Sequence, residues 1–120
     1  MKKLLILLCC TFNVGAHAAE IECELKYESP SDIAGCYEKQ SFSKVKKEYS
    51  QLENITKKVM PNDKSALTLL VESQKAWLKY RNSYCESYVD YHGEINNHAN
   101  CIVDLNNKRA EQLKSDSKAF

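Results

Sequence analysis

Three observations predict that this chain of 120 residues is all-α: a small antiparallel three-helix domain with a short N-terminal helical turn, stapled by two disulfides. Apolar residues recur at helical spacing through three long segments, and no segment alternates as a strand would. Pro61 and Gly93 separate those segments, so the connections are short and neighbouring helices run antiparallel. Beyond the N-terminal leader the cysteine count is even, as in small exported domains.

Residues 1–18 have the pattern of a secretory signal peptide. Two lysines precede the apolar run 4–12, and Ala16-His17-Ala18 is a small-x-small cleavage site. The run is too short to span a membrane. We expect cleavage after Ala18, with cleavage after Ala19 as the alternative. Residues 19–120 then form one periplasmic or secreted domain.

A lipid anchor is the competing interpretation of the leader, because it contains Cys9 and Cys10. The residue before a lipidated cysteine is normally small, and neither Leu8 nor Cys9 fits. We therefore expect no membrane anchor after cleavage.

The charges of the mature domain nearly balance. Without Lys2 and Lys3 the basic residues fall from 17 to 15, against 16 acidic residues, so the net charge is about −1. Nucleic-acid binding needs a concentrated basic face, which this balance disfavours. The charge balance thus disfavours nucleic acid as a partner. We also expect no cofactor and a monomeric chain.

Four cysteines remain after cleavage: Cys23, Cys36, Cys85 and Cys101. Three pairings are possible, and zinc ligation is the alternative, but no pair has C-x-x-C spacing. Cys85 and Cys101 each lie eight residues from Gly93, so a helical hairpin turning there would bring them level. We therefore pair Cys85 with Cys101. Cys23 then pairs with Cys36 and closes the N-terminal arm onto the body.

The N-terminal arm precedes a clear helix start. Residues 20–28 have no period, which predicts an irregular segment. Ser29-Pro30-Ser31-Asp32 has an N-cap hydroxyl, a proline at the first helical position and an acid three residues after the cap. The short turn of helix that follows should stop near Gly35. A long helix is then expected over 37–60, with its apolar positions at Phe42, Val45, Tyr49, Leu52 and Met60.

Two further helices complete the expected fold. Asn62 or Asp63 can cap the second, which should run to about Tyr91 before Gly93 breaks it. Asn96 or Asn97 can start the third, and residues 115–120 should fray. The apolar stripe of the third helix consists of Cys101, Ile102, Leu105, Arg109 and Gln112, with Leu113 at its edge.

Polar residues interrupt the apolar stripe of the second helix. Gln74 and Arg81 lie within it, and the chain has only two arginines, Arg81 and Arg109, against fifteen lysines. A planar guanidinium holds a fixed geometry that a flexible ammonium cannot. We interpret both arginines as fasteners between helices that bind a carboxylate or backbone carbonyls. A ligand-contacting role is the alternative.

Counting residues away from each turn also predicts which residues of neighbouring helices lie side by side. Arg109 falls beside Trp77, where it can stack on the indole, and Phe42 falls near Arg81. Glu38 lies one turn further along the first helix. It is therefore the expected carboxylate partner of Arg81.

The sequence offers no catalytic motif and no glycine-rich phosphate loop, so we do not expect an enzyme. Tyr80, Tyr84 and Tyr91 lie beside the stripe of the second helix, where they cover the edges of a thin core or form a recognition face. The polar turn near Gly93 matches no metal motif. The candidate partner-binding residues are Tyr80, Tyr84, Asp90, Tyr91, His92, Glu94 and His98.

Two spaced motifs resemble the signature of the LprI-type lysozyme-inhibitor family. The first is Gln74-x-x-Trp77-Leu-x-Tyr80-Arg81-x-x-x-Cys85, and the second runs from Cys101 through Arg109 to Leu113. The first half of the domain is similar to the family at Cys23, at the Ser29-Pro30-x-Asp32 turn, at Cys36 and at Tyr49.

The resemblance implies a small exported helical domain that binds a lysozyme and inhibits it. The chain departs from the family pattern at Phe42 and Asn82, where the family has acids, and its first cysteine pair is spaced by one residue more. The namesake is lipid-anchored, whereas this leader indicates release. The alternatives are a periplasmic immunity or chaperone-like partner of another exported protein, and a stabilising domain without a ligand.

Overall fold

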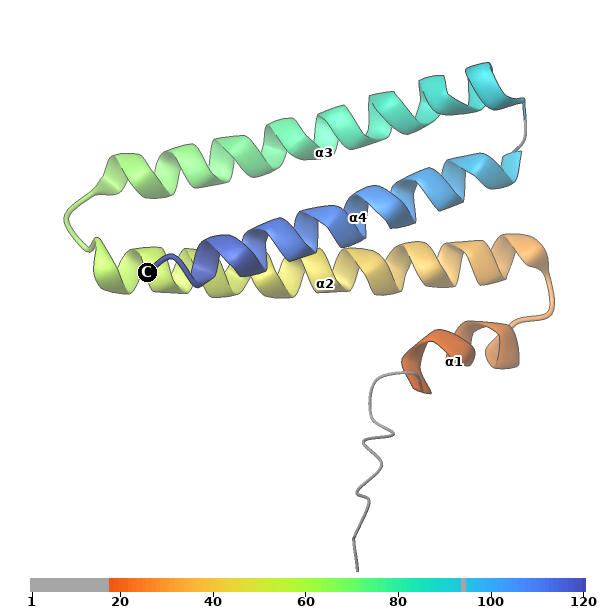
Figure 1. The fold of residues 1–120 in the computed structure, drawn as a ribbon, viewed down its shortest axis with the longest axis horizontal. Helices are drawn as coiled ribbons and strands as arrows, with labels where there is room; N and C mark the ends of the chain where they lie inside the picture. Colours follow the sequence, from red (N-terminus) through yellow and green to blue (C-terminus); the bar gives the residue numbers. More distant parts are fainter. Residues whose placement is uncertain (1–17, 94) are drawn as a thin grey trace, which may run out of the picture.

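The computed structural model describes residues 18–93 and 95–120, which form four helices joined by short connections (Figure 1). The predicted signal peptide falls almost wholly outside these residues, so it stays a prediction. The helices are α1 Ala18–Lys26, α2 Pro30–Val59, α3 Lys64–His92 and α4 Ile95–Ser117. No strand occurs in the described residues, which confirms the all-α fold. None of the described helices combines the length and the apolar character needed to cross a bilayer.

The long helices share the contacts unequally. α4 lies between α2 and α3, packs along α2 and runs parallel to it, while α3 runs antiparallel to both (Figure 1). α3 rests mainly on α4 and touches α2 far less, and α1 contacts α2 alone among the described elements. One side of α3 is therefore left without a neighbouring helix.

The core is thin and divides into two clusters. The first is centred on Val45, Leu52, Ala110 and Leu113, with Phe42, Tyr49, Leu70 and Trp77 packed against it. The second surrounds Cys85, Cys101 and Ile102, with Tyr88 and Leu105 at its edge. All of these residues except Ala110 lie in the predicted helical stripes. Gln112, which was expected in the stripe of the third helix, is exposed.

Three of the predicted helix ends are confirmed. The Ser29 hydroxyl caps α2 by accepting a hydrogen bond from the Asp32 backbone N–H at 3.1 Å. The Asp63 carboxylate caps α3 by accepting from the Ala66 N–H at 3.0 Å. Gly93 ends α3 with φ of 70°, the left-handed conformation that glycine adopts without strain.

Other predicted boundaries are wrong. α2 does not stop at Gly35 but continues from Pro30 to Val59. A glycine inside a helix lowers its stability by only about 1 kcal/mol relative to alanine, which is too little to end the helix. Residues 20–26 are helical rather than irregular, because the disulfide at Cys23 holds α1 on α2. α4 begins at Ile95, slightly before the expected Asn96 or Asn97. It also continues to Ser117, although fraying was expected from Ser115.

Replacing Gly35, inside α2, and Gly93, at the end of α3, with alanine is expected to change stability in opposite directions. Gly35→Ala should raise the free energy of unfolding by about 0.5–1 kcal/mol, because the position is helical and no heavy atom lies within 4 Å of the added Cβ. Gly93→Ala should lower it by about 1 kcal/mol, because φ is +70° there. Thermal melts of the two variants check this. Shifts of the same sign would contradict it.

Candidate interaction surface

Both predicted disulfides are confirmed. Cys85–Cys101 has an S–S distance of 2.12 Å and joins α3 to α4. Cys23–Cys36 has an S–S distance of 2.05 Å and joins α1 to α2. The zinc alternative is thereby excluded for these four sulfurs. Because Cys85 and Cys101 lie close to the turn at Gly93, their bond fixes the end of the α3–α4 hairpin.

A chain of buried hydrogen bonds joins the three long helices. Arg81 of α3 donates from Nη1 to the Asn106 side-chain oxygen at 2.8 Å. The Asn106 amide of α4 donates to the Ser41 hydroxyl of α2 at 2.9 Å, and Ser41 donates to the Glu38 carbonyl at 3.0 Å. Asn106 is completely buried. Arg81 is therefore a fastener between helices, as predicted.

The prediction that Glu38 is the carboxylate partner of Arg81 is wrong. In the described part of the chain the ion pairs join only lysines to acids, and Glu38 is not among them. Arg81 instead donates from Nε at 3.1 Å and from Nη2 at 2.8 Å to the side-chain oxygen of Asn82. Burial lowers the pKa of Arg81 from its ordinary value, and the charge of Glu38 opposes this only in part. Neutral amide oxygens thus take the place of the carboxylate.

Arg109 fastens α4 to α3 in the same way. Its Nε donates to the Gln74 side-chain oxygen at 3.1 Å, and its Nη1 donates to Gln112 at 2.8 Å. The guanidinium lies 5.7 Å from the Trp77 ring centroid, which confirms the predicted stacking. Burial lowers the pKa of Arg109 as well.

Arg81 also lies over aromatic rings. Its guanidinium carbon is 5.4 Å from the Trp77 centroid and 5.1 Å from the Phe42 centroid, so the predicted proximity of Phe42 and Arg81 is confirmed. Each such contact contributes about 0.5–2 kcal/mol, depending on how far water is excluded. The two arginines therefore clamp Trp77 between α3 and α4.

Asn106, the central member of these hydrogen bonds, was not among the predicted residues. The signal that could have identified it is its spacing: Asn106 lies four residues after Ile102 and four before Ala110, both of which are buried. A polar residue at that position of an apolar stripe needs partners. In the part of the chain that the structure describes, every buried side-chain nitrogen and oxygen has one.

Replacing Arg81 with lysine is expected to lower the free energy of unfolding by about 1–2 kcal/mol, because an ammonium cannot reach Asn106 and Asn82 together. Lys79→Ala is the matched control, since Lys79 is exposed on the same helix. Thermal melts of both variants check the difference. Equal melting temperatures would contradict the fastening role.

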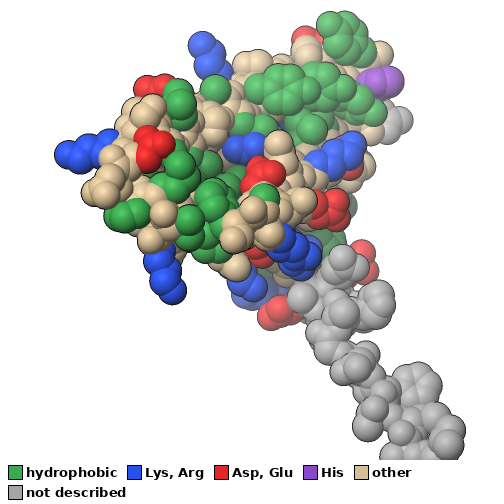
Figure 2. Space-filling model, turned by 60° about the vertical axis from the view of Figure 1, so that its left-hand side comes forward, with side chains coloured by type: hydrophobic (Ala, Val, Ile, Leu, Met, Phe, Trp, Pro, Cys, Tyr) green, Lys and Arg blue, Asp and Glu red, His purple; other side chains and the backbone are tan. Residues whose placement is uncertain are grey.

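Aromatic side chains form a row along α3. Ring centroids are 5.5 Å apart for Tyr80 and Tyr84, 6.2 Å for Tyr84 and Tyr88, and 4.2 Å for Tyr88 and His92. Figure 2 shows hydrophobic side chains side by side at this end of the molecule, with a histidine at the end of the row. Tyr80 is 53% exposed, so the row contributes to the surface as well as covering the core edge.

The row borders a groove of about 510 Å³ between α3 and α4. Its α4 side is polar, with Asp104 and Lys108 paired at 2.7 Å. Cys101 also lines the groove, so the Cys85–Cys101 disulfide joins its two sides. The tyrosines are thus carried by a pair of helices whose relative position the disulfide holds.

The last turn of α3 and the first turn of α4, which we call the tip, carry the other candidate residues. Asp90, Tyr91 and His92 are exposed, and His98 is half-buried. Glu94 lies outside the described residues, so its prediction stays untested. Where the chain is described, no three His, Cys, Asp or Glu side chains gather closely enough to hold a metal ion.

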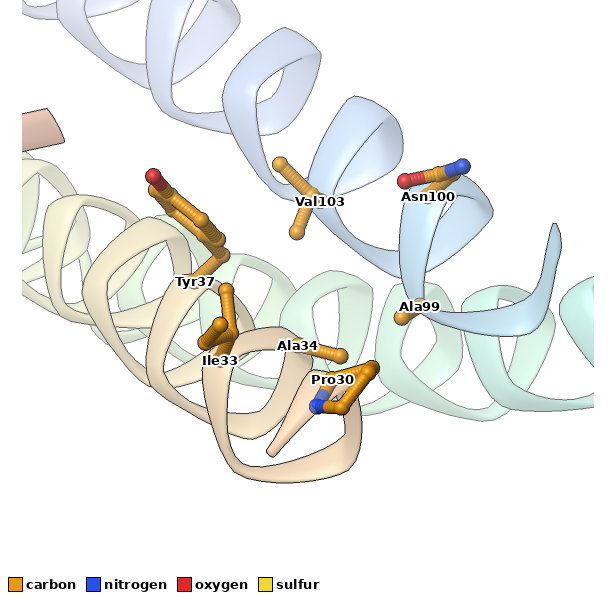
Figure 3. A pocket seen from close by; sticks show the side chains of 7 residues that line it. All are labelled: Pro30, Ile33, Ala34, Tyr37, Ala99, Asn100 and Val103. Carbon is orange, nitrogen blue, oxygen red and sulfur yellow. The ribbon is translucent and has the colours of Figure 1, made fainter. Parts of the chain in front are cut away.

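A second groove lies beside the start of α2. Figure 3 shows Pro30, Ile33, Ala34 and Tyr37 of α2 facing Ala99, Asn100 and Val103 of α4. Its volume is about 430 Å³, and most of these side chains are apolar. The sequence analysis did not predict this groove, because it depends on how α2 and α4 diverge.

Comparison with known protein families decides the relationship of the chain. The sequence model described as lysozyme inhibitor LprI matches residues 24–113. The chain belongs to the LprI lysozyme-inhibitor family. Comparisons with curated proteins and with solved structures give no match.

The LprI match covers α2, α3 and most of α4. It therefore includes Arg81, Arg109 and the residues that they bind. Gln74, Trp77, Arg81 and Arg109, the residues on which the resemblance rests, contact one another across α3 and α4. They therefore build the scaffold of this family member. The tyrosine row and the tip are surface regions of the same two helices.

Proposed function

We propose that this LprI-family protein is exported and inhibits a lysozyme by placing its tip in the substrate cleft of the enzyme. The family match is the observation that carries the proposal. The signal-like leader supports export, and the two disulfides suit an oxidising compartment. Inhibition of this kind needs no chemistry from the inhibitor, only occupation of the cleft.

The tip carries groups that suit this role. Glycoside hydrolases act with two carboxylic side chains on either side of the scissile bond, so a blocking element must offer hydrogen-bond donors. Tyr91 and His92 are exposed and carry such donors. The Cys85–Cys101 disulfide joins the two helices that carry the tip, which lowers the entropy cost of binding.

A turbidity assay with a bacterial cell suspension tests the proposal. The purified, oxidised protein should slow lysis in proportion to its concentration when animal and phage-type lysozymes are tried separately. Unchanged lysis at every ratio, with both enzymes, would count decisively against lysozyme inhibition.

Variants locate the contact surface. The double variant Tyr91→Ala, His92→Ala removes the exposed donors of the tip and should weaken inhibition at least about tenfold if the tip enters the cleft. The matched control is Asn62→Ala with Lys64→Ala, two exposed residues at the opposite end of α3. Loss of inhibition in Tyr80→Ala with Tyr84→Ala, but not in the tip variant, would move the contact to the tyrosine row.

A different experiment tests the alternative that this protein is an immunity or chaperone-like partner of another exported protein. Pull-down from an envelope extract, with the oxidised protein as bait, would retain a muramidase if the proposal is right. Specific retention of another exported protein, together with an inactive turbidity assay, would favour the alternative.

A further inference from the structure

The outward side of α3 carries an uncharged stripe. Its members alternate at spacings of three and four residues, the heptad pattern of paired helices: Ala66, Leu69, Ser73, Ala76, Tyr80, Ser83 and Ser87. All are exposed except Ala66 and Ser87, which are half-buried. Leu69 is 60% exposed and Tyr80 53%. Serines and apolar or aromatic residues thus form an exposed stripe without charge, which indicates an interaction surface.

The serines of the stripe can be buried at little cost. Ser73, Ser83 and Ser87 donate their hydroxyls to carbonyls of their own helix, at 2.8, 3.0 and 2.9 Å respectively. A partner that covers them therefore leaves no hydroxyl donor without an acceptor. Because serine and alanine are small, they also allow the backbone of a second helix to approach closely, and they leave holes that a large side chain can fill.

We propose that the partner is a second copy of this chain, packed antiparallel along α3. In the proposed register Tyr80 of each copy lies over Ser83 of the other, and Ala76 lies over Ser87, so large side chains meet small ones. The overlap extends from about residue 71 to residue 92, roughly 30 Å of helix at 1.5 Å per residue. Ala66 and Leu69 lie beyond it, and Asp90, at the next position of the stripe, lies opposite Ser73 at each end. The interface is the same patch on both copies, as a two-fold dimer requires.

The charges beside the stripe select this register. Glu72, Lys79 and Glu86 occupy the flanking positions, at intervals of one heptad. In the proposed register Lys79 of each copy meets Glu86 of the other, so opposite charges pair twice. A shift by one heptad would bring Lys79 onto Lys79 and Glu72 onto Glu86. A parallel arrangement would set Tyr80 against Tyr80 and leave Lys79 without an acidic partner.

Sedimentation velocity of charge-reversed variants tests the dimer. The wild-type chain should sediment as a dimer at high micromolar concentration. Lys79→Glu and Glu86→Lys should each weaken the dimer about tenfold or more, since either change places like charges at both symmetric contacts. The double variant Lys79→Glu, Glu86→Lys should recover dimerisation to within about threefold of wild type.

Glu72→Lys is the register control. Glu72 is exposed on the same flank but faces no charged residue in this register, so its reversal should leave the dimer unchanged. Weakening by Glu72→Lys in place of Glu86→Lys would overturn the register. A wild-type chain that stays monomeric at every concentration, as the sequence analysis expects, would overturn the dimer itself.

The dimer and the lysozyme contact are tested independently. Sedimentation measures mass without any enzyme, so either proposal can fail while the other holds. In the antiparallel arrangement the two tips lie at opposite ends of the dimer, with Asp90, Tyr91 and His92 at the edges of the overlap.

Discussion

Removing the Cys85–Cys101 disulfide is expected to lower the free energy of unfolding by about 3 kcal/mol. The bond closes a loop with a sequence separation of 16, and its loss returns the corresponding chain entropy to the unfolded state. Both sulfurs also belong to the second core cluster, so Cys85→Ala with Cys101→Ala loses packing as well. Guanidinium unfolding curves of the double variant against wild type measure the difference.

The other disulfide provides the control for this experiment. Cys23–Cys36 closes a loop of similar length, with a separation of 13, but it ties down only α1, which contacts α2 alone among the described elements. Its removal by Cys23→Ala with Cys36→Ala should release α1 and lower the free energy of the main unfolding transition by at most about 1 kcal/mol. If removal of either disulfide lowered the free energy of unfolding equally, α1 would not be separate from the main unfolding transition.

Replacing Asn106 with leucine is expected to lower the free energy of unfolding by about 2–3 kcal/mol. The substitution removes the acceptor of Arg81 and the donor to Ser41 at a position that is completely buried. A half-buried guanidinium that loses a partner is costly, and leucine has no polar group to replace it. Chemical denaturation of Asn106→Leu measures the loss.

Two further variants separate the network from simple repacking. Asn100→Leu makes the same change at an exposed site on α4 and should alter stability by less than about 0.5 kcal/mol. Ser41→Ala combined with Asn106→Leu should cost less than the sum of the single changes, because both remove the same hydrogen bond. Strictly additive losses would mean that Asn106 and Ser41 do not act together.

Much of the candidate site could be predicted from residue spacing. Arg81 and Arg109 lie in apolar stripes, so their interior roles followed from helical periodicity, and the stacking of Arg109 on Trp77 followed from counting back from Gly93. The partner of Arg81 could not be found in this way. A carboxylate at Glu38 and an amide at Asn106 are both within reach of a long side chain, and only the packing of α4 between α2 and α3 selects the amide.

The boundaries that were predicted wrongly share a physical cause. Gly35 and the arm before Ser29 have weak local preferences, so neighbouring structure decides their conformation: α2 propagates through Gly35, and the Cys23–Cys36 disulfide holds α1 against α2. The strong local signals at Ser29, Asp63 and Gly93 were sufficient by themselves, because each satisfies backbone groups or a left-handed φ without tertiary help.

The sequence by itself determined the helical class, the three long helices, both disulfide pairings and the family, because periodicity, caps and cysteine spacing are local or depend only on counting. Only the tertiary structure decided that Asn106 links the helices, that amides rather than an acid receive Arg81, and that α3 keeps one side uncovered. These features depend on which helix lies between the other two, and that order is set by how well side-chain surfaces pack, which residue spacing does not encode.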